Sequence, residues 1–190
     1  MAKDLPHLAI RPYPQEYASI WTSQDGIALT VRPIRPEDEP LMIKFHLTLS
    51  EDTVRLRYFG MAKLEKRIAH ERLTRICFND YDREIALVAV RQNPDTEEDE
   101  ILGIGRLIKA YNGSEAQYAI LISDDFQGHG LGTYLLSRLV EIGRQEGIDR
   151  IIGHILPENH LMQRVSRKVG FDVKYDRINE VMRAEIQLVQ

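Results

Sequence analysis

The stretch Gln127-Gly128-His129-Gly130-Leu131-Gly132 lies between an alternating apolar run, residues 115–122, and a helix-like run over residues 130–146. Glycine at every second position leaves this turn without side chains, so backbone N–H groups can approach a bound anion at the positive end of the following helix. We therefore expect the junction to bind an anion, and in particular a pyrophosphate.

Composition limits the class of protein. The 190 residues carry 25 Lys and Arg against 29 Asp and Glu, a net charge of −4. This balance argues against a general nucleic-acid binder, because affinity for a phosphate backbone needs a basic surface. The single cysteine, Cys77, cannot form an intramolecular disulfide, and no stretch has the apolar length of a membrane span or a secretory leader. We expect one cytoplasmic domain without a membrane partner, and its oligomeric state stays open.

Apolar periodicity predicts an α/β domain over residues 21–190, preceded by an extended arm over residues 1–20 that contains Pro6, Pro12 and Pro14. An acidic turn over residues 92–99 joins two of the strands into a hairpin. A helix between residues 122 and 150 allows the strands on either side of it to run parallel, so the sheet is mixed. The predicted strands are 27–32, 84–91, 100–108, 115–122, 150–156 and 181–188, and the predicted helices are 37–49, 64–78, 130–146 and 159–169.

Two motifs resemble the GNAT superfamily of N-acetyltransferases. Residues 127–132 fit its Gln/Arg-x-x-Gly-x-Gly/Ala signature, and residues 159–171 resemble its second signature, an Asn that opens a helix ending in Gly-Phe. Residues 13–60 and 81–89 are similar to the acetyltransferase domain of bacterial Pat-type protein lysine acetyltransferases, which is often fused to an NDP-forming acyl-CoA synthetase. The resemblance implies a GNAT fold, a mixed and mostly antiparallel sheet that is flanked by helices and splayed between its fourth and fifth strands.

Other glycine-rich phosphate sites fit less well. In a dinucleotide-binding motif that starts at Gly128, Thr133 occupies the third glycine position, and no strand ending in an acidic residue follows at the expected distance. A P-loop needs Gly-Lys-Ser/Thr, which the chain does not contain. A plain turn is the remaining alternative, but strand, helix and second signature together favour phosphate binding.

By this resemblance the strands over 115–122 and 150–156 part at a bulge, and the pantetheine arm of acetyl-CoA pairs with the backbone exposed there. A freed N–H near Leu121 would stabilise the oxyanion as the thioester carbonyl becomes tetrahedral. No metal is expected. The resemblance assigns main-chain contacts to Ile120, Leu121 and Ile122, the phosphates to Gln127, Gly128, His129, Gly130, Leu131, Gly132 and Thr133, and a contact near the acyl end to Asn159.

Amide formation needs a neutral amine, and a lysine ammonium has a pKa of about 10.4, so a base or a water chain must remove a proton. By the two-residue period, Glu115, Gln117 and Ala119 share one face of their strand. Gln117 aligns with a glutamate that acts as base in the Pat-type domains, and an amide cannot accept a proton at neutral pH. Either a neighbour takes over, or Gln117 positions a water, or the protein is weakly active or inactive.

Other candidates stay open. His154 lies where some GNAT members place a catalytic glutamate, and its imidazole is a plausible base, although a strand histidine is more often structural. Glu115 is a second candidate, with a solvated carboxylate as its alternative. Ser166 replaces a tyrosine that protonates the CoA thiolate in many members, and a serine hydroxyl is a poor acid. Tyr118 or Tyr175 is the substitute that the sequence offers.

The expected activity is transfer of an acetyl or other short acyl group from acyl-CoA to a protein lysine, with acyl-CoA synthetases as the target class that the resemblance suggests. Two alternatives remain. A non-catalytic acyl-CoA sensor is favoured by Gln117 and Ser166. An acetyltransferase of a small amine such as a polyamine would have a deep acidic pocket, whereas a shallow groove suits a protein lysine.

Overall fold

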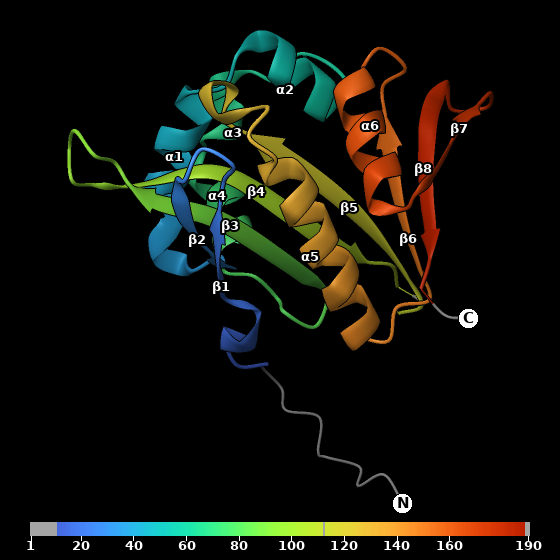
Figure 1. Ribbon diagram of the computed structural model, residues 1–190, viewed down its shortest axis with the longest axis horizontal. Coiled ribbons are helices and arrows are strands. Elements are labelled where there is room, and N and C mark those ends of the chain that lie inside the picture. Colours follow the sequence, from blue (N-terminus) through green and yellow to red (C-terminus); the bar gives the residue numbers. More distant parts are fainter. Residues whose placement is uncertain (1–10, 112, 189–190) are drawn as a thin grey trace, which may run out of the picture.

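The computed structural model describes residues 11–111 and 113–188 (Figure 1). These residues form an eight-stranded sheet of order β1-β2-β3-β4-β5-β6-β8-β7, in which only the β5–β6 pair is parallel. Within the described ranges, no helix is both long and apolar enough to cross a membrane. The strands are β1 (Ser19–Thr22), β2 (Ala28–Pro33), β3 (Glu84–Gln92), β4 (Asp99–Lys109), β5 (Glu115–Ile122), β6 (Arg150–Ile155), β7 (Asp172–Asp176) and β8 (Val181–Gln187).

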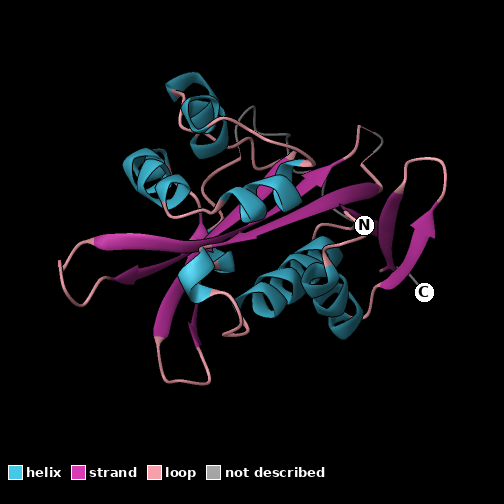
Figure 2. Cartoon of the chain, turned by 90° about the horizontal axis from the view of Figure 1, so that it is seen from above, coloured by secondary structure: helices cyan, strands magenta, loops and turns pink. Residues whose placement is uncertain are grey.

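Helices cover both faces of the sheet (Figure 2). The helices α5 and α6 pack on one face, and the helices α1 to α4 lie over the other. Three short 3-10 helices, η1 (Gln15–Tyr17), η2 (Pro36–Asp38) and η3 (Asp124–Phe126), lie in the connections. The α-helices are α1 (Glu39–Leu47), α2 (Glu51–Tyr58), α3 (Leu64–Arg67), α4 (His70–Cys77), α5 (Leu131–Gln145) and α6 (His160–Val169).

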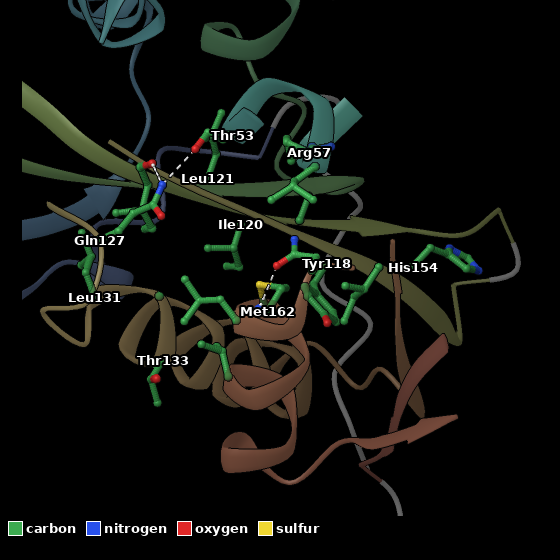
Figure 3. A pocket seen from close by; sticks show the side chains of 18 of the residues that line it. Thr53, Arg57, Tyr118, Ile120, Leu121, Gln127, Leu131, Thr133, His154 and Met162 are labelled. Atoms are coloured by element: carbon green, nitrogen blue, oxygen red, sulfur yellow. Dashed lines mark hydrogen bonds between the residues drawn. The ribbon is translucent and has the colours of Figure 1, made fainter. Parts of the chain in front are cut away.

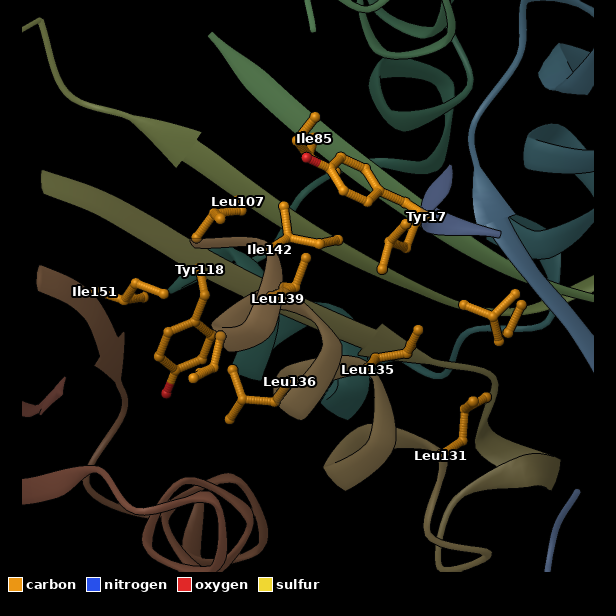
Figure 4. Close-up of a cluster of buried hydrophobic side chains, with 14 of the residues drawn as sticks. Tyr17, Ile85, Leu107, Tyr118, Leu131, Leu135, Leu136, Leu139, Ile142 and Ile151 are labelled. Atoms are coloured by element: carbon orange, nitrogen blue, oxygen red, sulfur yellow. The ribbon is translucent and has the colours of Figure 1, made fainter. Parts of the chain in front are cut away.

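The core under α5 brings the glycine turn against the middle of the sheet. Leu135, Leu139 and Ile142 recur at helical spacing on the buried face of α5 and pack toward β4 and β5 (Figure 4). In β4, a Cβ on Gly103 would lie 2.7 Å from Cδ1 of Ile122 and 2.9 Å from Cδ2 of Leu131, so the missing side chain lets both approach β4 closely. The start of α5 is therefore held close to β5.

The predicted sheet is confirmed, and every predicted strand lies within one residue of its observed bounds. The predicted helix over residues 64–78 is wrong as a single element, because the chain is extended at Ala69 between α3 and α4. Buried Arg67 occupies this break and donates hydrogen bonds from Nε to the Ala62 carbonyl and from Nη1 to the His46 carbonyl. The elements β1, α2 and β7 were not predicted, because each is short and mostly polar or exposed.

The beginning of the described chain is attached to the far end of α5. Glu146, just after α5, accepts hydrogen bonds from Arg11 (2.6 Å), Lys109 (2.8 Å) and the Tyr17 hydroxyl. Burial opposes ionisation of Glu146, but these donors outweigh it and lower its pKa to about 2. Residues 1–10 of the predicted arm lie outside the described residues, and strand β1 already begins at Ser19. The division of the chain at residue 20 stays a prediction.

Candidate functional site

The strands β5 and β6 separate after a short parallel contact. Their pairing covers three residue pairs and ends at Gln117 and Ile152. The pairing of β5 with β4 continues without a register shift to Ile122, so the bulge expected at this point is wrong. The sheet instead has a register shift in the β3–β4 pairing, where Ala89 pairs with Gly103 and Val90 with Ile101. The gap that the resemblance implies is present, but it has a different local cause.

Tyr118 separates the two strands. Its side chain packs on Gly153 of β6 so closely that a Cβ at Gly153 would overlap the ring. The Tyr118 hydroxyl lies 2.7 Å from Oγ of Ser166, which donates to the Met162 carbonyl at 2.8 Å, and its ring meets Phe171 edge to face. Since a buried phenol fills the position where the next strand pair would form, β5 and β6 diverge.

A cavity of about 490 Å³ follows this gap (Figure 3). It runs from the glycine turn to Gln117 and His154, and α2 contributes Thr53, Leu56 and Arg57 to its wall. Apolar periodicity does not indicate α2, whose N-cap is Ser50, with Oγ accepting from the Thr53 N–H. Of the residues expected to bind a cofactor, the cavity is lined by Ile120, Leu121, Ile122, Gln127, Gly128, Gly130, Leu131, Gly132, Thr133 and Asn159.

The glycine turn has the backbone that its sequence requires. Gly128 and Gly130 have φ of +86° and +91°, in the left-handed region that favours glycine. Gly130 is the N-cap of α5 and has no side chain to cap it, and the first turn of α5 contains no acidic residue. The first N–H groups of α5, at Leu131, Gly132 and Thr133, therefore form the positive end of the helix and have no capping side chain. This arrangement suits an anion.

Hydrogen bonds fasten α2 to the glycine turn. Gln127 Nε2 donates to Oγ1 of Thr53 (3.0 Å) and to the carbonyl of Ile122 (3.4 Å). Asp124 accepts from the Ser50 N–H and from the Thr53 hydroxyl, both at 2.9 Å. The helix α2 is thereby held over the gap between the strands, and Gln127 acts here as a structural contact as well as a lining residue.

His129 does not line the cavity, unlike its neighbours in the turn. Its ring stacks on Phe126 at 4.7 Å, with Nδ1 3.1 Å from the Gln127 carbonyl and Nε2 3.4 Å from a carboxylate oxygen of Asp25. The structure therefore places the His129 side chain against Phe126 and beside the turn between β1 and β2, outside the cavity lining.

The candidate bases occupy different positions. Glu115 is ion-paired with Arg150, which also reaches Glu185 at 3.3 Å, and does not line the cavity. Gln117 is exposed at the last β5–β6 pair, and exposed His154 lies at the end of the cavity opposite Gln127 (Figure 3). Among the described lining residues, none is Asp or Glu.

Tyr118 and Asn159 are both engaged by helix α6. Burial raises the pKa of Tyr118 to about 12 despite the hydrogen bond with Ser166. Asn159 caps α6, because its Oδ1 accepts from the Met162 N–H at 3.0 Å. Its Nδ2 has no hydrogen-bond partner within the described part of the chain, although the residue lines the cavity. Asn159 thus retains a donor for a ligand.

The family model for the acetyltransferase (GNAT) domain matches residues 28–172. The chain belongs to the GNAT acetyltransferase family. It is 29% identical to acetyltransferase PA5475 of Pseudomonas aeruginosa over 77% of this chain and 76% of that protein. A 62-residue segment is 27% identical to acetyltransferase Pat of Mycolicibacterium smegmatis, over 33% of this chain and 19% of that protein.

The GNAT domain of PAT from S. lividans has a similar structure, with a TM-score of 0.81 and 25% identity over 93% of this chain and 99% of that one. GNAT acetyltransferases use acetyl-CoA. The cavity of this GNAT domain fits such a ligand, because it combines uncapped helix amides at one end, apolar walls along the gap, and the cations Arg57 and Lys168.

Proposed function

We propose that this GNAT protein binds acetyl-CoA and transfers the acetyl group directly, in the cytoplasm, to lysine side chains of proteins of the acyl-CoA synthetase class. The observation that carries the proposal is the continuous cavity from the uncapped amides of α5 to Gln117 and His154. The similarity to Pat and to the PAT domain supports the choice of a protein acceptor.

The residues of the cavity divide the binding of acetyl-CoA between them. The N–H groups of Leu131, Gly132 and Thr133 bind the pyrophosphate at the positive end of α5. Main-chain groups of β5 from Ile120 to Ile122 pair with the pantetheine arm, and Nδ2 of Asn159 donates near the acyl end. Bound acetyl-CoA supplies an activated acyl group whose thioester carbon the amine attacks.

His154 is the proposed base. Among the described residues that line the cavity, His154 is the histidine and none is Asp or Glu. No other side chain of this lining is therefore of a type that accepts a proton readily near neutral pH. As the C–N bond forms and the C–S bond breaks, the amine proton passes to His154, directly or through a water that Gln117 orients. Tyr118 is a poor acid at a pKa of about 12, with its hydroxyl bonded to Ser166. The CoA thiolate, whose thiol has a pKa of about 8.5, is a leaving group stable enough to depart without a general acid.

The charge of the cavity bears on the acceptor. Arg57 and Lys168 line it, and none of its described residues is acidic. A polyamine carries several positive charges, so the cationic lining repels it. A protein lysine that reaches the gap from outside carries a single positive charge and is repelled less. The proposal therefore favours a protein lysine over a small polyamine.

Calorimetry with acetyl-CoA and acetyl transfer to acyl-CoA synthetase, measured on one sample, test the proposal. We expect both binding and transfer, and His154→Gln should lower kcat by about 10²-fold while leaving acetyl-CoA binding unchanged. Binding without transfer to any amine would make the protein an acyl-CoA sensor. The amide of Gln117, at the last β5–β6 pair, favours this alternative because it cannot act as a base. Absence of binding would defeat the proposal altogether.

A further inference from the structure

Arg57 lies near the acyl end of the cavity. It follows Thr53 by one helical turn on the same face of α2, about 6 Å along the axis. Thr53 contacts Gln127 at the glycine turn, so Arg57 is displaced from the phosphates toward Tyr118 (Figure 3). Arg57 also lines a smaller cavity that it shares with Ala119 and Leu121 of β5.

The guanidinium of Arg57 has no directly bonded partner in the described part of the protein. Its guanidinium makes no hydrogen bond or ion pair with a described residue, and its nearest aromatic contact is Tyr58, 5.2 Å from the ring centroid. Burial lowers its pKa, as do the positive charges of Arg106 and Arg72, while Tyr58 and the carboxylate of Glu84 oppose this shift. A half-buried cation to which no carboxylate is directly bonded is costly to hold.

The neighbouring arginines do have partners. Arg106 forms a bidentate ion pair with Glu84, at 2.5 and 2.9 Å. Arg72 donates to the Tyr58 hydroxyl at 3.0 Å and to the Arg67 carbonyl at 2.7 Å. Because Arg106 already engages Glu84, Arg57 is left as a fork of N–H donors that matches a carboxylate.

We infer that Arg57 binds a terminal carboxylate on the acyl group, so that acyl-CoAs of the malonyl and succinyl class bind more tightly than neutral ones. This inference rests on the proposed function. The smaller cavity, of about 20 Å³, has room for about one water-sized group, which is enough for one oxygen of a carboxylate but not for a peptide side chain. Arg57 also lines the larger cavity in which the proposed function places CoA, so an acyl chain bound there would have Arg57 in its wall. The carboxylate itself takes no part in the transfer.

The test compares succinyl-CoA with butyryl-CoA, a neutral ester of equal acyl length, by calorimetry on the whole chain. We expect about tenfold to hundredfold tighter binding of succinyl-CoA, the range of a hydrogen bond to a charged group. Arg57→Gln should bring the ratio close to one, and Arg57→Lys should keep part of it. Arg55→Gln, on the same helix but paired with Glu158 at the surface, is the matched control and should keep the full ratio.

Four results would overturn the inference. Equal affinities for both esters in the unaltered protein would show that the acyl end does not select charge, while acetyl-CoA binding would leave the proposed function intact. A loss of affinity for all esters by one factor in Arg57→Gln would assign Arg57 to the phosphates. A change confined to KM of the acceptor would assign it to an acceptor carboxylate. Absence of binding by any CoA ester would defeat both proposals.

Discussion

Replacing Gly130 by alanine tests the cradle on which the proposed function rests. An added Cβ would lie 3.7 Å from Cζ2 of Trp21, an ordinary contact, so the substitution acts through the backbone alone. Gly130 has φ of +91°, and an L-residue in the left-handed region costs about 1–2 kcal/mol. If the turn relaxes to avoid this cost, the N–H groups of Leu131, Gly132 and Thr133 lose their common direction. CoA binding must then restore the strained turn, which corresponds to about 5- to 30-fold weaker affinity.

Calorimetry with CoA and denaturant unfolding would be measured on Gly130→Ala and on Gly147→Ala. Gly147 follows the other end of α5, has φ of +69°, and has no atom within 4 Å of an added Cβ. Both variants should lose about 1–2 kcal/mol of unfolding free energy or less, but only Gly130→Ala should lose CoA affinity. If Gly130→Ala bound CoA as tightly as the unaltered protein, the phosphates would not lie at this turn.

Two further changes test the base and the attachment of α5. Gln117→Glu should raise the acetyl-transfer rate by about 10²-fold if the missing carboxylate is limiting, and an unchanged rate would discredit that account of the glutamine. The pKa of Glu146 falls from 4.5 unfolded to about 2 folded, so its contribution to stability is present above pH 4.5 and lost as the pH falls toward 2. Glu146→Gln should remove about 1 to 3 kcal/mol at neutral pH and flatten this acid dependence in unfolding experiments. Glu141→Gln, whose exposed carboxylate pairs with Arg138, should leave the dependence unchanged, and an equal effect of both would refute the assignment.

The elements that repeat an apolar pattern over several residues were predictable, because burial of one face leaves a period in the sequence. This holds for β5, for α5 and for the hairpin of β3 and β4. It fails for α2, in which Val54 is the buried residue and whose place over the gap depends on Gln127 and Asp124, more than 70 residues away. The contribution of Arg57 to the cavity was missed for the same reason.

Candidate residues on one strand received different surroundings. Glu115 and Gln117 share a strand face. Glu115 is nevertheless paired with Arg150 outside the cavity, whereas Gln117 lines the cavity. Tyr118, proposed from the sequence as a route to the sulfur, instead bonds to Ser166 and separates the strands. Spacing along a strand gives the face of a side chain but not its partner.

The conformation of the glycine turn is a local property, since the φ angles of Gly128 and Gly130 and the uncapped start of α5 depend on residues within one turn of each other. The sequence alone therefore determined the backbone geometry on which the proposed anion site depends. The proposed acyl end is different, because its character comes from Arg57, which has no bonded partner among the described residues, from Gln117, and from the packing of Tyr118 on Gly153. These groups belong to separate elements, so only packing decides which charges meet a partner and which remain available to a ligand.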